Sequence, residues 1–221
     1  MKAKHLISDT VPNLHTSDTG VRALSWMEIF RVSHLPIVNN KEFLGLISDT
    51  DIYDLNRAEE PIGNHSLSLF RPYVTADQHI FEVIDLASKL RLTVIPVLDE
   101  KKNYMGLITL MDLVNYFAEL SAFKNPGGII VLELNMNDYS LTEIANIIEG
   151  NDAKILSLYL TQPNQSMKLD VTIKVNRTDI SSLIQTFNRY DYTIKASFMD
   201  ENERDELYNR RFDEFMRYLS I

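Results

Sequence analysis

The sequence predicts an α+β protein in which two copies of a βαββα-type unit precede a βαββαβ unit and a C-terminal helix. Three observations lead to this fold class. The first is an internal repeat of about sixty residues. The second is a run of turn-forming residues at Lys124–Gly128, which indicates a domain boundary. The third is the alternation of apolar and polar residues in segments after that boundary, which is typical of strands with one buried face.

The repeat is visible when the sequence is shifted against itself. A shift of sixty aligns Val21–Val38 with Phe81–Leu98, including an arginine and a proline in each copy. The second copy then has one extra residue, so that Phe43–Tyr53 aligns with Tyr104–Val114 at a shift of sixty-one. In both copies Gly-Leu-Ile is followed by a hydroxyl residue and, three positions later, by an aspartate. These matches predict one repeat over 1–61 and another over 62–122.

Each repeat is expected to contain the same elements in the same order. An extended lead-in ends near Leu14 or Val74, and a helix follows whose apolar stripe in the first copy comprises Val21, Leu24, Ile29 and Val32. Short apolar runs then predict paired strands: Leu35–Val38 with Phe43–Ile47, and Ile95–Leu98 with Tyr104–Ile108. A second helix closes each copy, over Asp51–Leu55 and over Asp112–Leu120.

The runs His34-Leu-Pro-Ile-Val38 and Val94-Ile-Pro-Val-Leu98, each followed by Gly-Leu-Ile-Ser/Thr-x-x-Asp, resemble the CBS domain. Two such copies in tandem resemble a Bateman module. The resemblance implies a regulatory module without catalytic residues. In this family such modules often bind an adenosine compound such as AMP, ATP or S-adenosylmethionine.

The hydroxyl-x-x-aspartate motif is the candidate ligand site of each repeat. A helix N-terminus carries free N–H groups and a partial positive charge, so it suits a phosphate. Ser48 and Thr109 are then expected to hydrogen-bond the phosphate, and Asp51 and Asp112 the ribose hydroxyls. The family's geometry further implies that the adenine edge is held by the backbone beside four residues: Leu14, Val74, Leu35 and Ile95. His34 is expected to be a packing residue or to lie at the edge of the ligand.

Two features of the motif favour other interpretations. A Ser or Thr followed three positions later by an acidic residue is a common way to begin any helix, so simple capping is an equal alternative. Many family members also carry a cation within or just after the motif. Here the corresponding positions hold no cation: Asp49, Thr50 and Asp54 in the first repeat, and Leu110, Met111 and Asn115 in the second. The sequence therefore favours a nucleoside, AMP or a positively charged adenosine compound over a triphosphate.

The segment 127–200 resembles the ACT domain, a fold that senses amino acids or other small effectors. The expected strands are Ile129–Asn135, Lys154–Leu160, Lys168–Val175 and Thr193–Met199, with helices over Ser140–Glu149 and Ile180–Tyr190. The family's effector turn follows the first strand, where Asp138 is retained but Tyr139 and Ser140 replace its proline and glycine. Asp138 and Ser140 are thus a possible effector turn, and a sheet used for dimer contacts is the preferred alternative.

Residues 201–221 are expected to form a charged amphipathic helix. Its apolar stripe comprises Tyr208, Phe212, Phe215 and Leu219. Apolar anchors of this size need a partner surface. Both a helix paired between subunits and a helix packed on its own sheet satisfy that need.

Composition excludes several classes of function. The chain has no cysteine, which rules out disulfides, thiolate metal sites and cysteine nucleophiles and fits a cytoplasmic location. A net charge of -9 argues against nucleic acid as the partner. The sequence shows no signal peptide, membrane-spanning run, metal-binding motif or nucleotide-hydrolase loop.

The combination of a CBS pair with an ACT-like domain resembles the acetoin-utilisation accessory proteins. The sequence therefore predicts a cytoplasmic homodimer without a fixed cofactor, which binds an adenosine-type small molecule and passes the signal to an unidentified regulated protein. The main alternative is a non-catalytic adaptor whose CBS sites are empty. Amino-acid sensing through the ACT-like domain is a further alternative.

Overall fold

The computed structural model describes residues 1–55, 57–65, 69–120, 124–162 and 167–199. The chain divides into two compact units, Met1–Phe117 and Ala118–Ile221. The helix expected over 201–221 lies outside the described residues.

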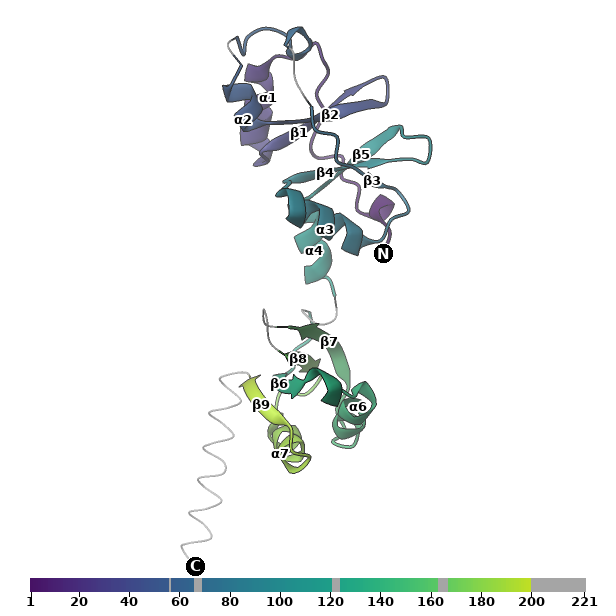
Figure 1. Ribbon diagram of the computed structural model, residues 1–221, viewed down its shortest axis with the longest axis vertical. Coiled ribbons are helices and arrows are strands. Elements are labelled where there is room, and N and C mark those ends of the chain that lie inside the picture. Colours follow the sequence, from purple (N-terminus) through teal and green to yellow (C-terminus); the bar gives the residue numbers. More distant parts are fainter. Residues whose placement is uncertain (56, 66–68, 121–123, 163–166, 200–221) are drawn as a thin grey trace, which may run out of the picture. The chain divides into compact units, whose positions relative to one another are not determined.

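The first unit contains both sequence repeats, and each repeat has the predicted elements (Figure 1). The first comprises α1 (Gly20–Phe30), β1 (His34–Asn39), β2 (Glu42–Ser48) and α2 (Asp49–Tyr53). The second comprises β3 (Val74–Thr75), α3 (Ile80–Leu90), β4 (Val94–Leu98), β5 (Tyr104–Thr109) and α4 (Leu110–Ala118). Helices α2 and α4 begin two residues before the expected positions, because each starts directly after its hydroxyl residue.

The two small sheets lie in the middle of the first unit, with α1 and α2 on one side and α3 and α4 on the other (Figure 1). Strands β1 and β2 form an antiparallel pair, as do β4 and β5, and each pair has a register shift at the same place in the repeat. The lead-ins add a parallel neighbour to each pair, where Leu14 bridges Ile37 and Val74 pairs with Val97.

The stripe expected on the first helix is wrong in part. Val21 and Ile29 of α1 are 51% and 65% exposed, whereas Ala23 and Met27 are buried together with Gly20. A Cβ on Gly20 would lie 2.9 Å from Ile52 Cγ2, so α1 approaches α2 along its small residues. This close approach turns the small side chains inward and leaves two of the larger apolar ones outside.

The earlier part of each lead-in segment crosses to the other repeat, whereas its end at Leu14 or Val74 pairs with its own repeat. The Ser8 N–H donates to the Leu107 carbonyl of the second repeat at 2.9 Å, and the Leu46 N–H of the first repeat donates to the Phe70 carbonyl at 2.8 Å. Ala3, at the start of the chain, belongs to the apolar core of the second repeat. Each repeat therefore contributes a segment that crosses the other's sheet, and the first unit is one interlocked structure.

The second unit has the βαββαβ element order that the sequence predicts (Figure 1). Its elements are β6 (Ile129–Asn135), α6 (Leu141–Glu149), β7 (Ile155–Thr161), β8 (Lys168–Val175), α7 (Ser181–Arg189) and β9 (Thr193–Phe198). The four strands form one antiparallel sheet in the order β7-β8-β6-β9. One apolar cluster joins a face of this sheet to both helices, including Ile130, Leu132, Ile144, Leu183 and Phe187.

Candidate functional site

The two hydroxyl-x-x-aspartate motifs have nearly the same geometry. In the first repeat the Ser48 N–H and Oγ–H donate to Asp51 Oδ2 at 2.8 and 2.7 Å, and the Asp51 N–H donates to Ser48 Oγ at 3.1 Å. In the second repeat Thr109 and Asp112 make the same three bonds, at 2.8, 2.6 and 3.1 Å. Each motif is thus a complete capping box, as the capping interpretation predicts.

The capping bonds leave some hydrogen-bond acceptors of the motif free. Within the described residues, every hydrogen bond to Asp51 and Asp112 goes to Oδ2, which leaves Oδ1 of each carboxylate open to a further donor. Each hydroxyl oxygen can also accept one more hydrogen bond. Thr109 is buried, with 8% of its surface exposed, and Asp112 is half-buried. The geometry therefore permits both a cap and a ribose contact at one carboxylate.

The electrostatic surroundings of the two motifs differ. Around the first motif, Asp49 and Asp54 add two carboxylates to that of Asp51. At the corresponding positions the second motif has Leu110 and Asn115. An anion at the first motif is therefore repelled by carboxylates that the second motif lacks.

The expected adenine-edge positions lie in the interior of the first unit. The side chains of Leu14, Leu35 and Ile95 are fully buried, and that of Val74 is 2% exposed. The backbone of Leu14 already pairs with β1, donating to the Pro36 carbonyl at 2.8 Å and accepting from the Val38 N–H at 2.7 Å. These four side chains are core residues, and they hold the lead-ins and central strands in register.

His34 lies at the contact between the two repeats. Thr93, from the second repeat, accepts from the Ser33 N–H at 2.9 Å, and its Oγ1 lies 3.0 Å from His34 Nδ1. Burial lowers the pKa of His34 below its ordinary value, although Asp49 and Asp51 oppose that shift. A neutral imidazole that accepts from the Thr93 hydroxyl fits these observations. Sequence reasoning did not single out Thr93, whose only signal is that it aligns with Ser33 in the repeat.

A groove of about 670 Å³ opens beside the first motif, between α1 and α2. Its lining includes Ser33 and Asp49 from the motif side, and Glu28, Arg31 and Tyr53 from the helices. Arg31 ends α1 in the left-handed conformation, with φ of 53°, and Arg91 ends α3 with the same φ. The aligned arginines of the two repeats are therefore helix-terminating residues.

The predicted effector turn of the second unit lies beside two grooves. Asp138 lines a groove of about 310 Å³, and Ser140 lines one of about 430 Å³ between α6 and α7. Ser140 caps α6 by accepting from the Glu143 N–H at 3.3 Å, and Asp138 accepts from Asn135 Nδ2 at 2.8 Å. Glu143 lines both grooves. It accepts a 2.9 Å hydrogen bond from Tyr192, whose pKa is raised to about 12 by burial and by this carboxylate.

Within the parts of the chain that the structure describes, no cluster of three histidine or acidic side chains is suited to a metal ion. The same parts contain no helix with the length and apolar character needed to cross a membrane.

Comparison with known proteins identifies the repeated unit. Residues 4–57 and 70–119 match the CBS domain family. A curated relative, inosine-5'-monophosphate dehydrogenase of Methanocaldococcus jannaschii, is 25% identical over 152 residues, which make up 67% of this chain. The match spans only 30% of the length of that relative.

Solved structures with a similar arrangement cover about half of the chain. A CBS domain pair/ACT domain protein from Thermotoga maritima is 22% identical, with a TM-score of 0.48, over 54% of this chain and 98% of that one. A Vibrio cholerae protein assigned to acetoin utilization is 24% identical, with a TM-score of 0.46, over 54% and 92%. CBSX2, solved in complex with AMP, is 16% identical, with a TM-score of 0.46, over 53% and 96%.

Proposed function

We propose that this chain, which contains a tandem CBS domain pair, is a non-catalytic regulatory sensor of an adenosine compound. The observation that carries the proposal is the motif of the second repeat. There Thr109 and Asp112 stand at the start of a nine-residue helix, and Asp112 keeps one carboxylate oxygen free. A helix N-terminus attracts a phosphate, and a carboxylate can accept from ribose hydroxyls.

The charge difference between the repeats supports different ligands at the two motifs. At the second motif Asp112 is the only carboxylate among residues 109–115, so we assign AMP or the uncharged nucleoside to this repeat. At the first motif three carboxylates surround a helix of only five residues. A positively charged adenosine compound of the S-adenosylmethionine type suits that motif better than a phosphate does.

A thermal-shift titration with matched variants tests the ligand assignment. AMP at a hundred times its dissociation constant stabilises the folded state by about 2.7 kcal/mol, which raises Tm by roughly 5–10 °C for a chain of this size. Asp112→Asn should abolish the shift with AMP, whereas Asp51→Asn should leave it unchanged. Both variants weaken a capping box, so the comparison separates ligand binding from helix stability. Loss of the shift in both variants, or in neither, would contradict the assignment.

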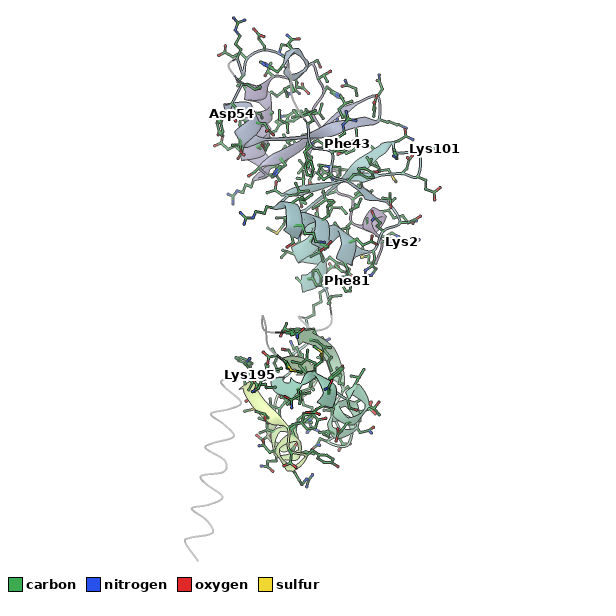
Figure 2. All side chains as sticks on the ribbon, in the orientation of Figure 1. Lys2, Phe43, Asp54, Phe81, Lys101 and Lys195 are labelled. Atoms are coloured by element: carbon green, nitrogen blue, oxygen red, sulfur yellow. The ribbon has the colours of Figure 1, made fainter. Side chains whose placement is uncertain are left out.

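Helix α4 also supports a route for transmitting the signal. Its exposed side includes the apolar residues Met111 and Val114, and Phe81 projects from the neighbouring α3 (Figure 2). We propose that these residues form the contact of a homodimer. Because α4 carries Asp112 as well, a ligand that binds unequally to two positions of α4 would shift the arrangement of the dimer. Light scattering with and without AMP tests the assembly. Val114→Glu should yield a monomer. A monomeric wild-type chain would refute the proposed homodimer.

The βαββαβ order and antiparallel sheet support an ACT-like assignment for the second unit, and one observation favours amino-acid sensing there. The groove between α6 and α7 is lined by Glu143 and Arg189, which have the charges needed to pair with the ammonium and carboxylate groups of an amino acid. A thermal shift with an amino acid alone, lost in Arg189→Gln, would place sensing in this unit.

An adaptor with empty CBS motifs remains the rival from another class of protein. The completed capping boxes support it, because they account for the motif residues without a ligand. No thermal shift with AMP, ADP, ATP, S-adenosylmethionine, NAD or any amino acid would favour the adaptor. For either function we propose a cytoplasmic location, which the cysteine-free composition suits.

A further inference from the structure

One face of the second unit's sheet has no helix on it within the described residues. Both α6 and α7 pack on the face that carries Ile130 and Leu132. Residues alternate between faces along a strand, and paired residues share a face. The open face of the two central strands therefore carries four pairs: Ile129 with Lys174, Val131 with Thr172, Glu133 with Asp170, and Asn135 with Lys168.

Aromatic side chains lie exposed on both outer strands of this open face. Tyr159 of β7 pairs with Thr172, and Phe198 of β9 pairs with Ile129, so both belong to the open face. Each is more than half exposed, and Val131 lies half-buried on the central strand β6. Apolar side chains thus lie on β7, β6 and β9 of the open face, with Thr172 between them on β8, and a covering segment would bury them.

The open face also holds an incompletely satisfied carboxylate. Asp170 Oδ2 accepts from Lys195 Nζ at 2.6 Å, and this bond raises the pKa of Lys195. Asp170 Oδ1 is buried and has no hydrogen-bond partner within the described residues. Glu133, which pairs with Asp170 across the strands, forms an ion pair with Lys168. Figure 2 shows Lys195 on β9, the strand at which the described part of this unit ends. An additional donor at Asp170 would complete the hydrogen bonding of this group.

We propose that residues 201–221 form a helix that packs across this open face of the same chain. The apolar stripe from Tyr208 to Leu219 would be about 16 Å long in a helix, and a four-stranded sheet is about 14 Å wide between its outer strands. At 3.6 residues per turn, Arg211 falls beside the stripe and Arg217 falls on the opposite side. Arg211 is the residue we assign to the open oxygen of Asp170.

The position of the segment in the chain favours its own sheet over that of a second copy. Strand β9 is an edge strand and ends at Phe198, directly before the segment. The residues from 199 to 207 can extend up to about 30 Å, which is enough to turn back over the sheet. A short tether of this kind gives an effective concentration in the millimolar range, above that of a free second chain.

Disulfide trapping in the full chain tests the inference, because the natural sequence has no cysteine. We would combine Met216→Cys, which leaves the stripe intact, with Thr172→Cys on the open face. The matched control combines Met216→Cys with Thr142→Cys on the exposed side of α6. A disulfide needs Cα atoms within about 7 Å, so the Thr172 pair should link at least tenfold faster than the Thr142 pair. The product should have the mass of a single chain, at a rate independent of protein concentration.

Other outcomes would overturn the inference. A product with the mass of two chains would show that the segment of a second copy covers the open face. Equal rates for the two pairs would show that the segment does not recognise this face. A charge test addresses the assigned arginine: Arg211→Glu should slow trapping about tenfold, whereas Arg217→Glu should have little effect. Equal effects of these two substitutions would refute the contact between Arg211 and Asp170.

Discussion

Each Gly-Leu-Ile motif is predicted to need its glycine, because a segment of the other repeat crosses close to the backbone there. Gly106 has a φ of 146°, a backbone conformation that side chains other than glycine rarely adopt. A Cβ at this position would lie 2.4 Å from Ile7 Cγ2 in the crossing segment. Gly106→Ala should therefore introduce two separate penalties, one in the backbone and one against the crossing segment.

The magnitudes of the two penalties can be estimated separately. The backbone conformation costs about 1–3 kcal/mol for a residue other than glycine, and the steric overlap costs about 1–3 kcal/mol. Gly106→Ala should thus lower the free energy of unfolding by roughly 2–6 kcal/mol. Ile7→Ala removes the overlapping methyl group, so in that background the cost of Gly106→Ala should fall to the backbone penalty alone. The expected coupling between the two substitutions is about 1–3 kcal/mol.

Urea unfolding followed by the fluorescence of Trp26 measures these free energies. Trp26 is the chain's one tryptophan, and it packs against the core of the first repeat. That core includes Leu92 and Leu107 of the second repeat, so the signal reports on both repeats. A cost below about 1 kcal/mol for Gly106→Ala would refute the backbone argument. Additive effects of Gly106→Ala and Ile7→Ala would refute the contact with the crossing segment.

Three further predictions concern single polar side chains. Burial lowers the pKa of His34, so the unfolded state binds more protons than the folded state just below pH 6.5. The free energy of unfolding should therefore rise with pH through that window. His34→Val should flatten this rise in urea titrations between pH 5 and 7.5. Asp18 is 8% exposed and accepts a hydrogen bond from the His15 N–H at 2.7 Å. Asp18→Ala should therefore lower the free energy of unfolding by about 1–3 kcal/mol in the Trp26 assay. An unchanged free energy would contradict the role of this bond. Tyr192→Phe should cost about 1 kcal/mol by losing the bond to Glu143. Because the pKa of Tyr192 is raised to about 12, its contribution is complete below pH 10 and lost from pH 10 to 12. Circular dichroism of the variant should therefore show less alkaline destabilisation than the wild type.

Much of the fold could be predicted because the pattern occurs twice. The strands His34–Asn39 and Val94–Leu98 follow the predicted apolar runs closely. The helices after the motifs begin earlier than predicted, at Asp49 and Leu110, because the capping aspartate is the third helical residue and not the first. The crossing of the lead-ins could not be predicted, since a segment with this pattern can pair with either repeat.

The site could be predicted only as far as local bonding determines it. The capping boxes at Ser48 and Thr109 depend on residues three apart in sequence, and both are confirmed. The partner of His34 depends on how the repeats pack, so Thr93 was missed. The outward positions of Val21 and Ile29 also depend on packing, because a helical stripe alone does not show which of its residues meet the neighbouring helix.

The crossing lead-ins also affect the order in which the protein can fold during synthesis. The segment around Ser8 leaves the ribosome about a hundred residues before its partner Leu107. At 5–20 residues per second this is a delay of roughly 5–20 s. Throughout that interval the segment around Ser8 lacks the strand with which it pairs. The apolar core of the first repeat also includes Leu92 and Leu107, so it is complete only after the second repeat has been translated, and a chain that terminates between the repeats would have an incomplete core.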